Sequence, residues 1–190
     1  MKSVAVYCGA RHGVRPVYTE AARELGRLLA ERDLTLVYGG GHVGLMGEVA
    51  ESCLAAGGKV VGVIPDFMVQ KELALSGLSE LYIVDSMHER KAMMAERADA
   101  YIAMPGGFGT FEELFEVLTW RQIGLHAKPV GLLNVAGYYD PLREFITNVE
   151  AEGFVHARDA ALIHWADTPA DLLQQLRSAP ADILHDWHRI

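Results

Sequence analysis

Cysteine, lysine and long apolar runs are all scarce in this sequence of 190 residues. Cys8 and Cys53 are its only cysteines, and they form neither a CxxC pair nor a disulfide framework, which favours a reducing cytoplasm. No apolar run approaches the length of a membrane span, and the first one, residues 4–8, is too short for a secretory signal. The sequence therefore predicts a soluble cytoplasmic protein without a membrane partner.

Basic residues are also fewer than acidic ones. Lysine and arginine together number 17 against 25 acidic residues, so the formal net charge is −8. Non-specific binding of nucleic acid needs a basic face, and we therefore expect no nucleic-acid partner. His185 and His188 have an i, i+3 spacing that metal ligands use, but no other ligand set converges on them in the sequence. We expect no metal.

Short apolar runs alternate with amphipathic segments along the whole chain. The runs predict strands at residues 4–8, 34–38, 59–64, 81–84, 100–104, 129–133 and 161–165. The segments between them predict helices at residues 16–32, 44–56, 86–98, 111–123 and 140–152, and a last one from residue 168. Residues 66–80 are expected to form a loop or a short helix. This alternation predicts an α/β fold in one domain, residues 1–190, with a Rossmann-like, open, mostly parallel sheet and helices on both faces.

Residues 105–113, PGGFGTFEE, join a glycine-rich loop to a predicted helix start. They follow a predicted buried strand, so the loop lies at the carboxyl end of that strand. Its three glycines would let the backbone approach a ligand closely. The free amide groups of the first helical turn, together with the helix dipole, favour negative charge at this point. The stretch therefore predicts a phosphate-binding loop.

The same loop delivers two carboxylates, Glu112 and Glu113, which we place within the first helical turn. A carboxylate there should stay ionised, and its position beside a phosphate suggests chemistry on a phosphorylated small molecule. Thr110 and Glu113 also match a capping box, in which Glu113 would only stabilise the helix start. A plain cap does not need three glycines, so the pattern favours the anion site, and the two interpretations are compatible.

Residues 39–44, GGGHVG, contain the GxGxxG pattern of dinucleotide-binding loops between a predicted strand and a predicted helix. Asp66 lies roughly 20 residues further on, where a ribose-binding acid is expected. The usual fingerprint, however, occupies the first strand–helix turn, and residues 9–12 do not match it. We therefore interpret the stretch as a second phosphate- or sugar-facing loop at the carboxyl edge of the sheet. Its glycines are Gly39, Gly40, Gly41 and Gly44.

Arg90 and Lys91 stand near the start of a predicted helix, where the helix dipole disfavours cations. This mismatch suggests an anionic partner, although most such pairs belong to a solvated helix face. Arg90 is the stronger candidate, because its planar guanidinium can hold a carboxylate or a phosphate oxygen with two hydrogen bonds.

The segments SMHERK (86–91) and PGGFGTFEE (105–113) together closely resemble the Lonely Guy family, the cytokinin riboside 5′-monophosphate phosphoribohydrolases. The resemblance extends to residues 38–41, 44–47, 62–65 and 128–134, and it covers the chain to about residue 155. It implies a nucleotide-binding domain that hydrolyses the N-glycosidic bond of a purine nucleoside 5′-monophosphate to free base and ribose 5-phosphate. The base would be adenine or an N6-modified adenine.

The resemblance also implies roles for individual residues. Arg90 and Glu113 match the catalytic pair, and no cofactor is implied. The expected substrate-binding residues are Glu72, Lys91, Gly106, Gly107, Phe108, Gly109, Thr110, Glu112 and Thr119, with the glycines of the 39–44 loop added from the pattern above. A homodimer is also implied, and the apolar Phe115, Leu118 and Trp120 on one helix are more than a single buried face needs.

Three other functions compete with this one. Proteins with this motif are often labelled lysine decarboxylase-like, but a pyridoxal enzyme needs a lysine in a cofactor cradle. The five lysines, Lys2, Lys59, Lys71, Lys91 and Lys128, offer no such cradle. A non-catalytic nucleotide sensor or carrier would share the glycine loops, but would not need Arg90 and Glu113 together. A nicotinamide oxidoreductase would depend on the 39–44 loop alone.

Overall fold

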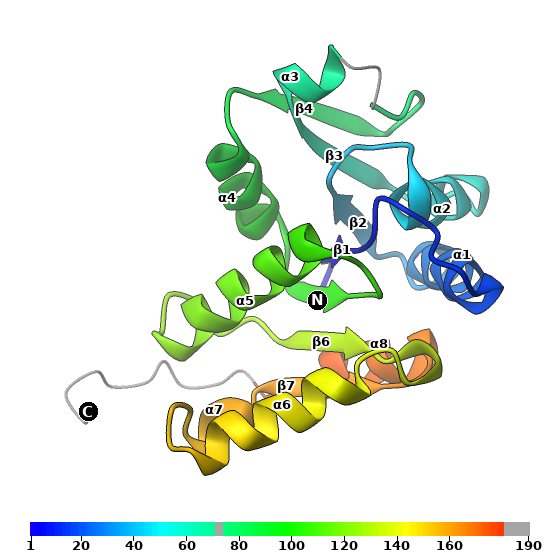
Figure 1. The fold of residues 1–190 in the computed structure, drawn as a ribbon. Helices are drawn as coiled ribbons and strands as arrows, with labels where there is room; N and C mark the ends of the chain where they lie inside the picture. Colours follow the sequence, from blue (N-terminus) through cyan, green and yellow to red (C-terminus); the bar gives the residue numbers. More distant parts are fainter. Residues whose placement is uncertain (71–73, 181–190) are drawn as a thin grey trace.

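The computed structural model describes residues 1–70 and 74–180, which form a seven-stranded parallel sheet (Figure 1). The strand order is β4-β3-β2-β1-β5-β6-β7, and every pair of neighbouring strands is parallel. The α/β class and the parallel sheet predicted from the alternating pattern are therefore confirmed. The strands are β1 (Ser3–Tyr7), β2 (Thr35–Tyr38), β3 (Val60–Pro65), β4 (Glu80–Val84), β5 (Ala100–Ala103), β6 (Val130–Leu133) and β7 (Ile163–Ala166).

Helices cover both faces of the sheet. One face packs against α1 (Pro16–Glu31), α2 (Gly44–Ala55) and α8 (Pro169–Ser178), and the other against α4 (Met87–Arg97), α5 (Phe108–Gln122) and α6 (Asp140–Ala151). The remaining helices are the short α3 (Asp66–Val69) and α7 (Ala157–Ala160) and the 3₁₀ turn η1 (Val135–Gly137). Within the described residues, no helix combines the length and the apolar character needed to cross a bilayer.

The strand β1 shows why apolar residues follow one another without alternating with polar ones. Val4 and Val6 point into the core on the α1/α2 side, whereas Ala5 and Tyr7 point into the core on the α4/α5 side. Successive side chains of a strand face opposite sides, and both sides are covered here, so all four are buried.

Three local features differ from the sequence-based expectation. The helix after the glycine loop begins at Phe108 instead of residue 111, and α7 and η1 were not predicted. Ser86 and Glu89 also form a variant of a capping box at the start of α4: Ser86 Oγ accepts from Glu89 N–H at 3.1 Å, and the Glu89 carboxylate accepts from Asp85 N–H at 3.0 Å. The reciprocal bond thus reaches one residue further back than the standard box.

The strand order reverses at β1. From β1 the chain adds β2, β3 and β4 on one side, and β5, β6 and β7 on the other. The loops that follow β1 and β5 therefore leave the carboxyl edge of the sheet side by side. Gly9 N–H donates to Pro105 O at 3.1 Å and joins these two loops. Such a switch point is where open α/β sheets bind ligands.

Candidate active site

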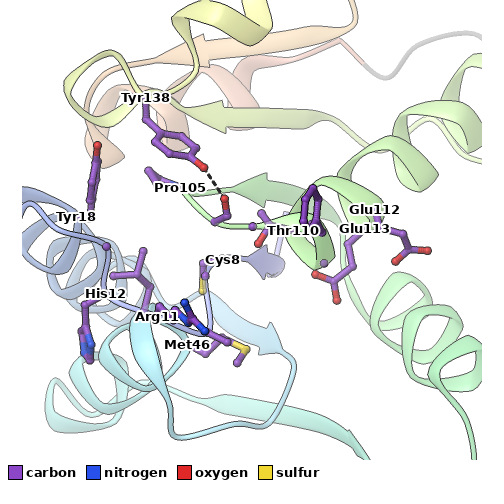
Figure 2. Close-up of a pocket in the computed structure, with 18 of the residues that line it drawn as sticks. Cys8, Arg11, His12, Tyr18, Met46, Pro105, Thr110, Glu112, Glu113 and Tyr138 are labelled. Carbon is purple, nitrogen blue, oxygen red and sulfur yellow. Dashed lines mark hydrogen bonds between the residues drawn. The ribbon is translucent and has the colours of Figure 1, made fainter.

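A cavity of about 720 Å³ opens at this switch point (Figure 2). Its walls come from the loop after β1, the start of α5, and side chains of α2, α3 and α4. In Figure 2, Tyr18 and Tyr138 lie on one side and Glu113 on the other, with Thr110 between them. The volume is within the range of small-molecule sites.

The start of α5 forms one wall of the cavity. Gly107 is the N-cap residue, and Phe111 N–H makes the first amide bond of the helix, to Gly107 O at 3.1 Å. The amides of residues 108–110 precede that bond, so the helix itself does not use them. A Cβ on Gly106 would lie 2.1 Å from Thr110 Oγ1, so only glycine fits there. The predicted phosphate loop thus has the amide groups and the helix dipole that favour an anion.

The predicted capping box at this helix is wrong. Thr110 is the third residue of α5, and the N-cap Gly107 has no side chain to accept a hydrogen bond. The helix begins earlier because Phe108 and Gly109 adopt helical conformation, which the glycine-rich sequence did not suggest. Glu113 consequently lies in the second turn, and the first turn contains no acidic residue.

Arg90 and Glu113 form a buried ion pair. Arg90 Nη1 lies 3.4 Å from Glu113 Oε1, and the two residues are 7% and 8% exposed. Arg90 Nε donates to Val63 O at 3.2 Å, which fixes the guanidinium against β3. Both residues line the cavity. The structure thus brings together α4 and α5 side chains that stand 23 positions apart in the sequence.

Burial changes the protonation of Glu113. It raises the pKa of Glu113 from 4.5 to about 7, and neighbouring Glu112 also raises this pKa, while the Arg90 guanidinium opposes the rise. Near neutral pH, Glu113 is therefore protonated far more readily than an exposed glutamate. The expectation of a fully ionised carboxylate in the first turn was wrong because the residue is deeper in the helix and removed from water.

Two glycines of the 39–44 loop pack closely against groups that line the cavity. A Cβ on Gly39 would lie 1.8 Å from Arg90 Nη2, so the guanidinium occupies the space that any larger residue would fill. Gly44 has φ +58°, and a Cβ there would lie 2.3 Å from the Ala10 backbone. Gly39, Gly40, Gly41 and Gly44 do not themselves line the cavity. Gly39 lets Arg90 approach closely, and Gly44 does the same for the loop after β1.

Two other expected substrate-binding residues, Lys91 and Thr119, lie outside the cavity lining. Lys91 is buried against α5, where Nζ donates to Glu112 and, at 3.0 Å, to Glu116. Thr119 is exposed and its hydroxyl donates to Phe115 O at 2.7 Å. Neither lines the cavity, although Glu112 does. Glu72 falls outside the described residues.

Several cavity residues were not anticipated. Tyr18, Tyr138 and three methionines line the cavity, as does Cys8, whose thiol pKa is raised by burial. The methionines are Met46, Met68 and Met87. An aromatic residue or a methionine near a strand end usually belongs to the core, so the sequence pattern did not mark these residues as part of a site. Tyr138 could have been suspected only from its position just after β6, at the carboxyl edge of the sheet.

Within residues 1–70 and 74–180, no three His, Cys, Asp or Glu side chains come together as a metal site. His185 and His188 lie outside this part of the chain.

Comparison with solved structures shows a shared fold. The molybdenum cofactor carrier protein of Chlamydomonas reinhardtii matches with a TM-score of 0.71 and 22% identity, over 94% of this chain and 99% of the other. The molybdenum cofactor binding protein of Rippkaea orientalis matches with a TM-score of 0.73 and 21% identity, over 93% and 96%. At such identities the likeness concerns the fold alone.

Sequence relatives are much closer. A family model described as "Possible lysine decarboxylase" matches residues 46–176. A probable cytokinin riboside 5′-monophosphate phosphoribohydrolase of Oryza sativa subsp. japonica, LOGL2, is 48% identical over 92% of this chain and 72% of its own length. The Arabidopsis thaliana enzyme LOG7 is 49% identical over 92% and 81%. This identity over most of both chains shows that the protein belongs to the Lonely Guy family of cytokinin riboside 5′-monophosphate phosphoribohydrolases.

Proposed function

We propose that this protein hydrolyses the N-glycosidic bond of purine nucleoside 5′-monophosphates, releasing the free base and ribose 5-phosphate. One observation carries the proposal: the buried Arg90–Glu113 pair and the amide-bearing start of α5 line the same cavity. The first offers acid–base chemistry and the second offers a phosphate anchor. The names of the sequence relatives describe the same reaction.

The proposed mechanism places the substrate phosphate at residues 107–110 and the ribose beside Glu113. Breaking the bond between C1′ and the base produces an oxocarbenium-like ribose, which the Glu113 carboxylate stabilises. Water then adds to C1′ and gives a proton to the Glu113 carboxylate. Glu113 passes this proton to the departing base, which is released neutral. A pKa of about 7 suits a group that both accepts and releases a proton. Arg90 holds the carboxylate in place and favours its ionised form.

The base is proposed to pack against the methionines that line the cavity. Met46, Met68 and Met87 come from α2, α3 and α4, so three separate elements contribute flexible apolar side chains to the cavity lining. Methionine adapts to irregular shapes. Such side chains would accept the flat purine and also the N6-modified adenine that the family resemblance implies.

Two alternatives are less consistent with these residues. A carrier on the same fold, as in the molybdenum cofactor proteins, would have no use for a buried Arg90–Glu113 pair, and those proteins share only the fold. Lysine decarboxylation needs a reactive lysine at the site. None of the lysines that the structure describes lines the cavity, and Lys91 is held by two glutamates.

The direct test is product analysis after incubation with AMP. We expect adenine and ribose 5-phosphate in equal amounts, because one bond is hydrolysed per turnover. Chromatography detects the base, and a coupled assay detects the sugar phosphate. A protein that binds AMP with unchanged nucleotide recovered after prolonged incubation would instead be a sensor or carrier.

We also propose a homodimer formed through the α4/α5 face. Met87 at the start of α4 and Phe115 on α5 are 38% and 42% exposed, although both are large apolar side chains. Leu118 and Trp120 are partly buried and pack against the core of their own chain, so fewer apolar groups remain for a partner than the sequence suggested.

Light scattering at micromolar concentration should give twice the mass of one chain. Phe115→Glu should shift the protein towards monomer, because it places a charge in the proposed interface. Phe145→Glu is the matched control, since Phe145 lies on α6 and is 58% exposed. A monomeric wild type would contradict the proposal, as would equal dissociation by both variants.

A further inference from the structure

We propose that Tyr138 is a positioning residue for the phosphate seat, which it serves by fixing the peptide between Gly106 and Gly107. The Tyr138 hydroxyl donates to Gly106 O, the contact drawn as a dashed line in Figure 2. Tyr138 reaches the loop from the turn after β6, 32 residues further along the chain. The inference rests on the proposed function, because it concerns how the phosphate of that substrate is held.

The peptide between Gly106 and Gly107 needs an external restraint. Its carbonyl and its N–H point in opposite directions, and a peptide flanked by two glycines can rotate at little steric cost. Rotation would exchange a donor for an acceptor at the N-cap of α5. An oxygen presented there would repel a phosphate that the neighbouring amides attract. The Tyr138 hydroxyl opposes this rotation by holding the carbonyl.

The preceding peptide is held independently. Gly9 N–H donates to Pro105 O at 3.1 Å, so the loop after β1 fixes the peptide between Pro105 and Gly106. Each of the two peptides before Gly107 is therefore held by a donor from another part of the chain. The loop keeps one shape although it contains three glycines within four residues.

Tyr138 itself has little freedom. Its ring packs edge-on against Tyr18 at 5.8 Å and against Tyr139 at 4.9 Å between ring centroids. The backbone of the turn is also fixed, because Asn134 Oδ1 accepts from Tyr139 N–H at 2.7 Å. The hydroxyl is thus presented to Gly106 O from a rigid support.

Tyr139 provides a matched control. Its hydroxyl donates to Met104 O at 2.6 Å, also on the segment that leads from β5 into the loop, but the side chain is 1% exposed and does not line the cavity. Tyr139→Phe therefore removes the hydrogen bond to Met104 O and leaves the peptide between Gly106 and Gly107 unchanged. It reports what the loss of such a bond does to stability alone.

The experiment measures inhibition of AMP cleavage by inorganic phosphate, ribose 5-phosphate and adenine. In Tyr138→Phe the inhibition constants of phosphate and ribose 5-phosphate should rise about tenfold, the usual contribution of one or two hydrogen bonds, while that of adenine changes less than about twofold. KM for AMP should rise more than kcat falls. In Tyr139→Phe all three inhibition constants should match the wild type, with a lower melting temperature.

Three outcomes would overturn the proposal: unchanged phosphate inhibition in Tyr138→Phe, an equal loss of phosphate and adenine binding, or the same selective loss in Tyr139→Phe. Failure of the proposed function is separately visible, because the wild type would then release no adenine from AMP. Calorimetric titration of inorganic phosphate into the wild type and both variants tests Tyr138 in that case too. Phosphate binding that is unaffected by Tyr138→Phe would contradict the assignment.

Discussion

Glu113→Gln should abolish most turnover of AMP and, at the same time, make the protein more stable at alkaline pH. Glutamine matches glutamate in shape but can neither accept the proton of water nor stabilise positive charge on the ribose. A fall in kcat of about 10³-fold is expected for the loss of one general base that also provides electrostatic stabilisation. Activity close to that of the wild type in a folded Glu113→Gln protein would exclude the proposed role.

The gain in stability follows from the pKa of Glu113. The folded protein raises it from 4.5 to about 7, so the folded state binds the proton more tightly than the unfolded chain does. As pH rises from about 4.5 through 7, the wild type therefore loses stability, on the order of 3 kcal/mol when Glu113 is fully ionised. Glutamine stays neutral and avoids this loss, and Arg90 faces a neutral partner in both proteins at low pH.

Thermal unfolding at two pH values tests this prediction. Glu113→Gln should melt well above the wild type at pH 8, and the difference should shrink towards zero below pH 4.5. Over the same range, kcat/KM of the wild type should rise with pH around 7, because the ionised form is the active one. Glu116→Gln, on the same helix but outside the cavity, is the control and should retain turnover without becoming more stable.

AMP should be cleaved far more efficiently than adenosine by the same preparation. The phosphate is remote from the bond that breaks, so its binding energy holds C1′ against Glu113 and its loss should lower kcat as well as affinity. Two or more charge-assisted hydrogen bonds at the start of α5 correspond to about 10³-fold in kcat/KM. Adenine release from both substrates, measured side by side, gives this ratio.

Gly109→Val separates the phosphate seat from the rest of the site. A Cβ at Gly109 would meet no atom within 4 Å, so the fold should accept the side chain, which would instead occupy the cavity. The variant should lose its preference for AMP because the valine blocks backbone approach. Equal specificity constants for AMP and adenosine in the wild type would mean that this loop is only a helix start.

The sheet could be predicted from the sequence because its strands are buried on both faces. Continuous apolar runs such as residues 59–64 suit strands that are covered on both faces, and their alternation with helical segments predicted a parallel α/β fold. Strand order and the position of the switch point depend on long-range pairing. No local pattern encodes that β1 lies between β2 and β5.

The sequence predicted those site residues that belong to short motifs with a recognisable chemical role. Arg90 and Glu113 stood out as residues, but their contact depends on how α4 packs on β3 and α5 packs on β1 and β5, which neither motif specifies. The predicted capping box at Thr110 was wrong because α5 already begins at Phe108. Glycine is rare inside helices, so the glycine-rich loop gave no sign of this earlier start. Tyr138 was missed since an aromatic residue after a strand ordinarily belongs to the core.

The central position of β1 has a consequence for how the chain folds. β1 pairs with β2 through a single helical crossover, residues 8–34, whereas its pairing with β5 joins Val4 to Ala100 across half the sequence. Closing so long a loop carries a large entropic cost and is slow relative to local pairing. The cavity exists only once this seam has formed, because its walls are attached to both strands. We therefore expect the site to be completed late in folding. A chain that has assembled only β1 to β4 contains the β3 carbonyl that holds Arg90, but not Glu113, its acidic partner.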